Sequence, residues 1–209
     1  SNHRNDDYCE GTAWQWTWFV PHDVDGLVEL MGGRDAFIGK LDSLFTADSK
    51  LEGESTSVDI SGLIGQYAHG NEPSHHIAHL YNYVGQPWRT QEIVDEVLHT
   101  LYFNNPDGLS GNEDCGQMSA WYILNAMGFY QVCPGKPVYS IGRPLFNEAT
   151  VHLKDGKSFK VIAHNNSRDN KYVQSIVLNG NKLETPFFTH QDIVDGGTLE
   201  LTMGSEPLK

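Results

Sequence analysis

The hydrophobic pattern changes its period once along this 209-residue chain, and the change falls between Gly128 and Gly135. Before it, apolar residues recur every three to four positions, which is typical of amphipathic helices. After it, apolar and polar residues alternate, which is typical of half-buried strands. Helices followed by strands in separate blocks predict an α+β fold. We therefore divide the chain into a helical part, 1–130, and an antiparallel β region, 131–209.

Four segments of the helical part carry an apolar stripe at helical spacing, namely 32–45, 74–85, 90–102 and 116–128. Ser74 and Thr90 are N-cap residue types at the starts of their segments, and Gly85 and Gly128 are stop signals at the ends of theirs. The spacing therefore predicts four helices with these boundaries.

Two dipeptides mark hairpin turns in the β region, Asp155-Gly156 and Asn179-Gly180. Each lies between runs in which apolar and polar residues alternate, the arrangement expected of a tight turn between antiparallel strands. The closing segment, 197–204, has its apolar residues on one face. We expect about five to seven strands in one antiparallel sheet.

Composition restricts the possible function classes. Lys and Arg number 14 against 27 Asp and Glu, a net charge of −13, which disfavours binding to a nucleic acid polyanion. No apolar run approaches the ~18 residues of a membrane span. Three cysteines (Cys9, Cys115 and Cys133) are too few for a disulfide framework. The sequence is compatible with one disulfide and one free thiol, or with three buried thiols. The first residues contain neither an initiator Met nor a secretory signal, so we expect a piece of a longer protein.

The first stretch with chemical potential is "YCEGTAWQWTWF", where Glu10 precedes Trp14, Trp16 and Trp18. A carboxyl packed against indole rings is poorly solvated, which suits a general acid. Tryptophan faces also stack on sugar rings. The plainer alternative, an exposed Glu at a helix start beside core tryptophans, is favoured by composition alone. The alternating tryptophans indicate a strand.

The second stretch is "YAHGNEPSHHIAH". His75 and His79 have the i, i+4 spacing of a zinc site on a helix, although no Glu lies between them. Asn71 and Glu72 lie in a Gly-Asn-Glu-Pro loop, whose oxygen donors suit calcium. A polar capping turn followed by core histidines explains the same residues, and on spacing alone it is the favoured interpretation.

The third stretch is "GNEDCGQMSAWY". Asp114 followed by Gln117 fits a capping box at a helix start. Capping alone leaves the neighbouring Asn112 and Glu113 unexplained. A carboxylate held by backbone N–H groups also stays ionised, which suits a general base that activates water. The cap is narrowly favoured, and the two roles are compatible.

Taken together and in order, "CEGTAWQWTWFVPHDVDGL", "YAHGNEPSHH", "GNEDCGQMSAWYILNAMGFY" and "YSIGRPLF" resemble the C-terminal part of glycoside hydrolase family 92. Its members are calcium-dependent exo-α-mannosidases, mostly bacterial, that invert the anomeric configuration. The resemblance implies that the helical part contributes the last helices of an (α/α)6-barrel and that the rest forms a small C-terminal β region. It also implies an N-terminal β-sandwich in the same protein.

The resemblance implies roles for individual residues. Glu10 matches the general acid and Asp114 the general base. The other implied site residues are Asn112 and Glu113 beside the base, Asn71 and Glu72 at a calcium ion, and Trp14, His69 and Gln15 at the mannose.

The expected function is therefore that of an inverting, calcium-dependent exo-α-mannosidase, with α-1,2 as the expected linkage, acting on mannan or N-glycan oligosaccharides. The expected partners are a mannose-containing oligosaccharide and the N-terminal part of the same protein, on which turnover should depend. The expected location is the periplasm, the cell surface or the outside of the cell. The alternatives are a non-catalytic, calcium-dependent carbohydrate-binding module and a zinc hydrolase that uses His75 and His79.

Overall fold

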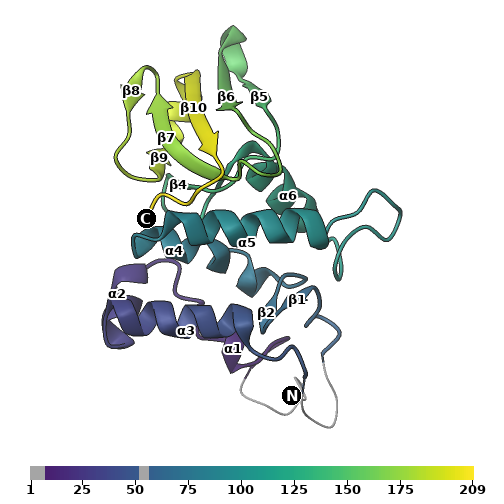
Figure 1. Cartoon of the computed structure of the whole chain (residues 1–209). Coiled ribbons are helices and arrows are strands. Elements are labelled where there is room, and N and C mark those ends of the chain that lie inside the picture. Colours follow the sequence, from purple (N-terminus) through teal and green to yellow (C-terminus); the bar gives the residue numbers. More distant parts are fainter. Residues whose placement is uncertain (1–7, 52–56) are drawn as a thin grey trace. The chain divides into compact units, whose positions relative to one another are not determined.

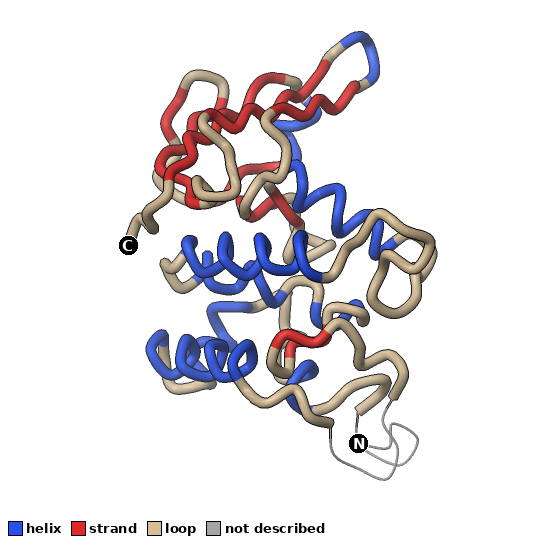
Figure 2. The backbone as a smooth tube through the Cα atoms, turned by 45° about the vertical axis from the view of Figure 1, so that its right-hand side comes forward, coloured by secondary structure: helices blue, strands red, loops and turns tan. Residues whose placement is uncertain are grey.

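The protein is described here by a computed structural model that covers residues 8–51 and 57–209 (Figure 1). Its backbone contacts divide it into two compact units. Unit 1 comprises Ser1–Ile77 and His99–Ala120, and unit 2 comprises Ala78–Leu98 and Trp121–Lys209. The chain contains both helices and strands (Figure 2), and the helices precede most of the strands along the sequence, which confirms the predicted α+β class. The domain boundary between residues 130 and 131 and the (α/α)6-barrel stay predictions.

Unit 1 is built around the apolar face of one helix, α3 (Arg34–Thr46). Its elements are α1 (Ala13–Trp16), α2 (Val24–Leu30), α3, the two short strands β1 (Leu63–Ile64) and β2 (Tyr67–Ala68), and the 3-10 helix η1 (Glu72–Ser74). The predicted stripe of α3 is buried, with Phe37, Leu41 and Leu44 fully inaccessible to solvent. Phe37 packs edge-to-face on Trp18, with ring centroids 5.3 Å apart. This core fixes the backbone that follows Glu10.

The strand indicated by the alternating tryptophans is wrong, because this segment begins with the helix α1. Thr12 is its N-cap and accepts from the backbone N–H of Trp14. The side chain of Gln15 accepts in return from the Thr12 backbone N–H at 2.8 Å. A capping box of this kind satisfies donors that a strand would have to pair with a neighbouring strand.

The continuous helix predicted over 74–85 is also wrong. The chain forms η1, a second 3-10 helix η2 (Ile77–His79) and one α-helical turn, α4 (Leu80–Tyr83). Nearly every side chain of this stretch is buried, so there is no polar face of the kind that accompanies a long amphipathic helix. Pro73 lies in the first turn of η1, where its missing N–H is tolerated.

The two long helices occur close to their predicted positions. α5 (Pro87–Thr100) buries Ile93, Val94, Val97 and Leu98, as predicted. It begins at its own proline, so Thr90 is a buried residue of the helix and not its N-cap. α6 (Gln117–Met127) ends before Gly128, whose φ of 102° suits the stop that the sequence predicted.

The strands of unit 2 form two sheets. A five-stranded sheet has the order β5-β6-β10-β7-β8, and a three-stranded sheet has the order β3-β4-β9. The strand bounds are β3 (Phe129–Tyr130), β4 (Val138–Ile141), β5 (Glu148–His152), β6 (Ser158–His164), β7 (Tyr172–Leu178), β8 (Asn181–Lys182), β9 (Phe187–Thr189) and β10 (Gly197–Gly204), with the 3-10 helix η3 (Lys154–Gly156) after β5 and the helix α7 (His190–Val194) after β9.

Both predicted hairpins are confirmed. β5 pairs antiparallel with β6 across the turn at Asp155, and β7 pairs antiparallel with β8 across Asn179-Gly180. Asn179 and Gly180 have φ of 50° and 81°, the backbone that such a turn demands. The larger sheet is mixed, however, because β10 runs parallel to β6. Phe159 and the apolar face of β10 lie in the core of this unit.

Candidate active site

Three segments far apart in the sequence meet in unit 1. They are the turn at Glu10, the Gly-Asn-Glu-Pro loop with Asn71 and Glu72, and the loop 111–116 that contains Asp114. The Asn71 amide donates to the Glu10 carbonyl oxygen at 2.8 Å. The charges of Asp114 and Glu10 both act on the Glu72 carboxyl. The structure thus brings the residues implied as acid, base and metal ligand into one neighbourhood, and their roles stay predictions.

Two glycines explain how closely the loop that contains Glu72 and the loop that contains Asp114 approach each other. A Cβ on Gly111 would lie 2.9 Å from the carbonyl oxygen of Gly70, and a Cβ on Gly70 would lie 3.0 Å from that of Ser110. Contacts below about 3 Å are not accommodated without movement of the backbone. Gly111 also has a φ of 76°, which favours glycine. The loops that contain Glu72 and Asp114 therefore touch through their backbones.

The two segments with the candidate acid and base have left-handed backbone at non-glycine residues. Glu10 has a φ of 54°, Asp114 of 50° and Cys115 of 58°. Such conformations are uncommon for side chains other than Asn and Asp, and they persist only when the surrounding structure imposes them. Residues of this kind cluster at functional sites. The strain here points to the same two carboxylates that the sequence singled out.

Negative charge is crowded around Glu72. Partial burial raises the pKa of its carboxyl, a hydrogen bond to the backbone opposes that rise, and the nearby Asp114 and Glu10 raise the pKa further. Asp114 contributes both by its charge and by a hydrogen bond between the two side chains. A carboxylate in this setting favours a proton or a cation in its neighbourhood.

The predicted capping box of Asp114 and Gln117 is wrong, because Glu113 supplies the cap. The two oxygens of the Glu113 carboxylate accept from the backbone N–H and the hydroxyl of Ser119, each at 2.9 Å. Asp114 has left-handed backbone, lies before the first residue of α6 and is exposed. Its carboxylate does not cap the helix and is therefore available to act in the candidate active site. Glu113 and Asn112 as helpers of the base stay predictions.

Of the two interpretations of Glu10, the packing of its carboxyl against indole rings is wrong, and the exposed Glu that composition favoured is confirmed. The tryptophans act instead on the backbone around it. The indole N–H of Trp16 donates to the carbonyl oxygen of Cys9 at 2.9 Å, and Trp18 is fully buried in the core. They fix the turn that presents Glu10.

His69 is completely buried. Its Nδ1 lies 2.8 Å from the Tyr67 hydroxyl and its Nε2 lies 2.7 Å from the Tyr102 hydroxyl. Burial, and next the charge of His75, hold its pKa well below the usual value of 6.5, so the ring is neutral. Its part in lining a mannose subsite stays a prediction.

Gln15 and Trp14 lie on α1. Gln15 is buried, and besides its contact with Thr12 its amide donates to the Gln66 carbonyl oxygen at 2.6 Å. Trp14 is half-buried beside a hollow of about 410 Å³, and the Lys40 ammonium lies 4.4 Å from its ring centroid. An aromatic ring at a hollow is open to contact with a ligand. The substrate contacts of both residues stay predictions.

The histidine contacts do not favour a zinc site. His75 places Nε2 at 2.9 Å from the His69 carbonyl oxygen and Nδ1 at 3.0 Å from the Gln117 amide nitrogen. The two ring nitrogens of His79 are hydrogen-bonded to a serine hydroxyl and an asparagine amide oxygen. A zinc ligand needs a free nitrogen lone pair directed at the metal. Because the ring nitrogens of His75 and His79 already take part in hydrogen bonds, neither ring is placed to bind zinc.

The donor chemistry around Glu72 fits calcium better. Its carboxylate and the side-chain oxygen of Asn71 are oxygen donors in one loop, and two further carboxylates crowd the same place. Calcium prefers such ligands. The Asn71 oxygen already accepts from the Glu72 backbone N–H at 3.1 Å, which leaves it a second lone pair. Among residues 8–51 and 57–209, no group of three or more His, Cys, Asp or Glu side chains is arranged to hold a metal ion by itself.

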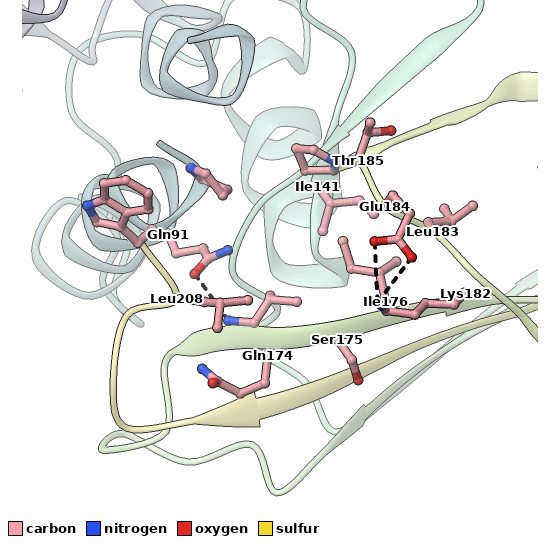
Figure 3. A pocket seen from close by; sticks show the side chains of 14 residues that line it. Gln91, Ile141, Gln174, Ser175, Ile176, Lys182, Leu183, Glu184, Thr185 and Leu208 are labelled. Atoms are coloured by element: carbon pink, nitrogen blue, oxygen red, sulfur yellow. Dashed lines mark hydrogen bonds and ion pairs between the residues drawn. The ribbon is translucent and has the colours of Figure 1, made fainter. Parts of the chain in front are cut away.

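A separate hollow of about 170 Å³ lies in unit 2, between α5 and the β7–β8 hairpin (Figure 3). Trp88 and Gln91 line it from the helix, and Lys182 and Glu184, which form an ion pair at 3.1 Å, line it from the hairpin. None of the site residues implied by the sequence lines this hollow.

Comparisons with known proteins give one consistent result. The profile of the glycosyl hydrolase family 92 catalytic domain matches residues 1–205. An uncharacterized secreted glycosidase of Arthroderma benhamiae is 32% identical over 200 residues, which make up 94% of this chain and 24% of that protein.

Two solved structures from Bacteroides thetaiotaomicron are similar throughout this chain. A family GH92 alpha-mannosidase in complex with mannoimidazole is 43% identical with a TM-score of 0.90, and the match covers 97% of this chain and 26% of that one. A family GH92 inverting mannosidase is 44% identical with a TM-score of 0.82, over 96% of this chain and 28% of that one.

This chain therefore belongs to glycosyl hydrolase family 92, as part of its catalytic domain. It spans about a quarter of the length of the relatives it matches. Within the described residues, no helix has the length and apolar character needed to cross a membrane.

No pattern in the sequence indicated the contact between His75 and Gln117, which joins η1 to the first turn of α6. The only available signal was that both side chains can form hydrogen bonds, and many other residues of this chain share that property.

Proposed function

We propose that this chain provides the general acid, Glu10, and the general base, Asp114, of an inverting, calcium-dependent exo-α-mannosidase. The observation that carries the proposal is the meeting of these two carboxylates around Glu72, both on left-handed backbone. Family membership supports a glycosidase, and the solved relatives named as mannosidases support mannose as the sugar.

The chemistry follows from the two carboxylates. Glu10 in its protonated form donates a proton to the glycosidic oxygen as the bond to the leaving sugar breaks. Asp114, ionised, takes a proton from a water molecule that attacks the anomeric carbon from the opposite face. In inverting enzymes the two carboxyl groups lie roughly 6.5–9.5 Å apart, which leaves room for that water. One displacement of this kind reverses the anomeric configuration.

Glu72 and Asn71 are the residues we propose to hold calcium. When bound, the ion supplies a template for two neighbouring hydroxyl groups of the mannose ring. Its positive charge would also offset the carboxylate crowding that, after partial burial, raises the pKa of Glu72. The mannose contacts proposed for Trp14, Gln15 and His69, and the help that Asn112 and Glu113 give to the base, complete the site.

The proposed substrates are mannose-terminated oligosaccharides of mannan or N-glycans with an α-1,2 linkage. The remaining part of a longer protein is the proposed partner that completes the pocket, since the chain covers a quarter of its relatives. The proposed location is the periplasm, the cell surface or the outside of the cell, which agrees with a relative named as secreted.

Substrates with different leaving groups distinguish the role of the general acid from that of the general base. In the native-length protein, Glu10→Gln and Asp114→Asn should each lower kcat on α-1,2-mannobiose by about 10²- to 10⁴-fold. On an aryl mannoside whose leaving group needs no proton, Glu10→Gln should recover most of its activity, whereas Asp114→Asn should not. Equal recovery of both variants, or of neither, contradicts the assignment.

Calcium is tested by removing it. EDTA should abolish turnover, added calcium should restore it, and Glu72→Gln should raise the calcium concentration needed for half-maximal activity. Unchanged turnover in EDTA contradicts the metal part of the proposal and leaves the carboxylate pair in place.

The second candidate function is a non-catalytic, calcium-dependent carbohydrate-binding module. The half-buried ring of Trp14 beside its hollow favours this candidate. It predicts mannoside binding without turnover in the native-length protein, with an affinity that is unchanged by Glu10→Gln.

A further inference from the structure

The loop that contains Asp114 has little regular structure of its own. It has three consecutive residues of positive φ, and α6 begins immediately after it. A general base must nonetheless be held to within a fraction of an ångström, because a displacement of about 1 Å can cost 10²-fold in rate. Contacts from outside the loop must therefore hold it.

The histidine at position 75 supplies one such contact. His75 is the C-cap of η1, three residues after Glu72, and is 2% exposed. A carbonyl oxygen can only accept, so His75 Nε2, 2.9 Å from the His69 carbonyl, must be the donor. In the neutral ring Nδ1 is then an acceptor, and the Gln117 amide, 3.0 Å away, is its donor. Gln117 is the first residue of α6.

A second series of hydrogen bonds reaches the first turn of α6 from His69. The Tyr102 hydroxyl donates to the carbonyl oxygen of Met118 at 3.1 Å, so it accepts from Nε2 of His69. Nδ1 of His69 then accepts from the Tyr67 hydroxyl. The donor and acceptor assignments are consistent along both series of hydrogen bonds. Both series end at the first turn of α6.

We propose that His75 and Gln117 are positioning residues that set Asp114 against Glu72 through their shared hydrogen bond. The His75 ring is fixed to the loop that contains Glu72, and the Gln117 amide is fixed to the end of the loop that contains Asp114. The hydrogen bond between them therefore joins the C-terminal ends of the two loops. The contact of Gly70 with Gly111 joins their N-terminal ends. The proposal rests on the proposed function only for its effect on catalysis.

Two substitutions of the histidine separate the hydrogen bond from the bulk of the ring. His75→Asn places an amide oxygen near the Nδ1 position, where it accepts from Gln117. His75→Gln reaches the Nε2 position, keeps the bond to the His69 carbonyl and loses the one to Gln117. In the native-length protein, His75→Gln and Gln117→Leu should each lower kcat on α-1,2-mannobiose by about 10- to 100-fold with KM changed less than about threefold. His75→Asn should retain most of kcat.

The double variant His75→Gln/Gln117→Leu should lose no more activity than the worse single variant, because both changes remove the same bond. Gln191→Leu, which removes an exposed amide on α7 in unit 2, is the matched control and should keep wild-type kcat. Additive losses, equal activity of the two His75 variants, or an effect confined to KM would overturn the proposal.

Amide hydrogen exchange tests the positioning without any turnover. Gln117→Leu should speed exchange in peptides covering 111–118 by about tenfold or more and leave peptides of α7 unchanged. Unchanged exchange in 111–118 overturns the proposal whether or not the protein hydrolyses mannosides. A wild-type protein that hydrolyses no mannoside contradicts the proposed function instead, and the exchange result still decides the role of His75 and Gln117.

Discussion

His76 makes the stability of unit 1 depend on pH. Its ring is 4% exposed, its Nε2 lies 2.7 Å from the carbonyl oxygen of Trp18, and it packs edge-to-face on Phe19. Burial lowers its pKa from 6.5 to about 4, against the opposing effect of the hydrogen bond to Trp18. The neighbouring His75 has its pKa lowered to about 4 as well, again mainly by burial.

The sign of the effect follows from proton binding. Because the folded state holds the pKa below its unfolded value, the unfolded chain takes up the proton first as the pH falls. The contribution to stability is therefore complete above pH 6.5 and disappears as the pH falls toward 4. Going from pH 7 to pH 5 should cost about 2 kcal/mol of unfolding free energy for each ring, or about 4 kcal/mol for both.

Urea unfolding at pH 7 and pH 5, followed by tryptophan fluorescence, measures this loss, since the buried Trp18 lies beside His76. His76→Gln keeps a donor for the Trp18 carbonyl and removes the titration, so the variant should lose about 2 kcal/mol less than the wild type on acidification. The control His152→Gln, at an exposed position of β5, should keep the full loss. A His76→Gln protein with the same loss as wild type would refute the reasoning.

Three further substitutions test the packing. Arg143→Met leaves the carboxylate of Asp95 without the buried guanidinium that lies 2.9 Å from it, and should cost about 3–5 kcal/mol in urea unfolding. Gly65→Ala should cost more than about 1 kcal/mol by the same assay, because its φ is 59° and the new Cβ would lie 2.4 Å from the carbonyl oxygen of Leu44. Glu113→Ala removes the cap on the first turn of α6 and should lower stability by about 1 kcal/mol.

Matched variants give these results their meaning. Arg143→Met/Asp95→Leu should recover part of the loss of Arg143→Met, since no buried charge is left unpaired. Gly156→Ala has a φ of 74° but open space around the new Cβ, so it should cost less than Gly65→Ala. For Glu113→Ala, a fall in kcat as large as that of Asp114→Asn would assign it a catalytic role in addition to capping.

Local signals in the sequence were sufficient where the structure is local. The turns at Asp155-Gly156 and Asn179-Gly180 were predictable because a turn of two or three residues is decided by its own residues. The stripe of α3 was predictable because one face of a surface helix repeats every three to four residues. The parallel pairing of β10 with β6 was not, since it joins strands separated by more than thirty residues and depends on the whole sheet.

The candidate active site shows the same contrast between features that were predictable from local sequence and features that depend on the whole fold. The sequence singled out Glu10, Glu72 and Asp114, and the structure gathers them, but the details of their environment were misjudged. The expected cap at Asp114 belongs to Glu113, and the burial of Glu10 that would suit a general acid does not occur. Both depend on backbone conformation, since left-handed φ at Glu10 and Asp114 decides where each carboxylate lies. A residue pattern does not specify such strain, which the surrounding fold imposes.

The stereochemistry of the first product tests the central claim most directly. Proton NMR of the methyl glycoside of α-1,2-mannobiose, in which only the released mannose has a free anomeric centre, resolves the two anomers of that mannose when it is recorded with the native-length protein and calcium in the first minutes of turnover. We predict β-mannose first, with α-mannose appearing only as the sugar equilibrates in water. Release of α-mannose first would show retention and would contradict the pairing of Glu10 as acid with Asp114 as base.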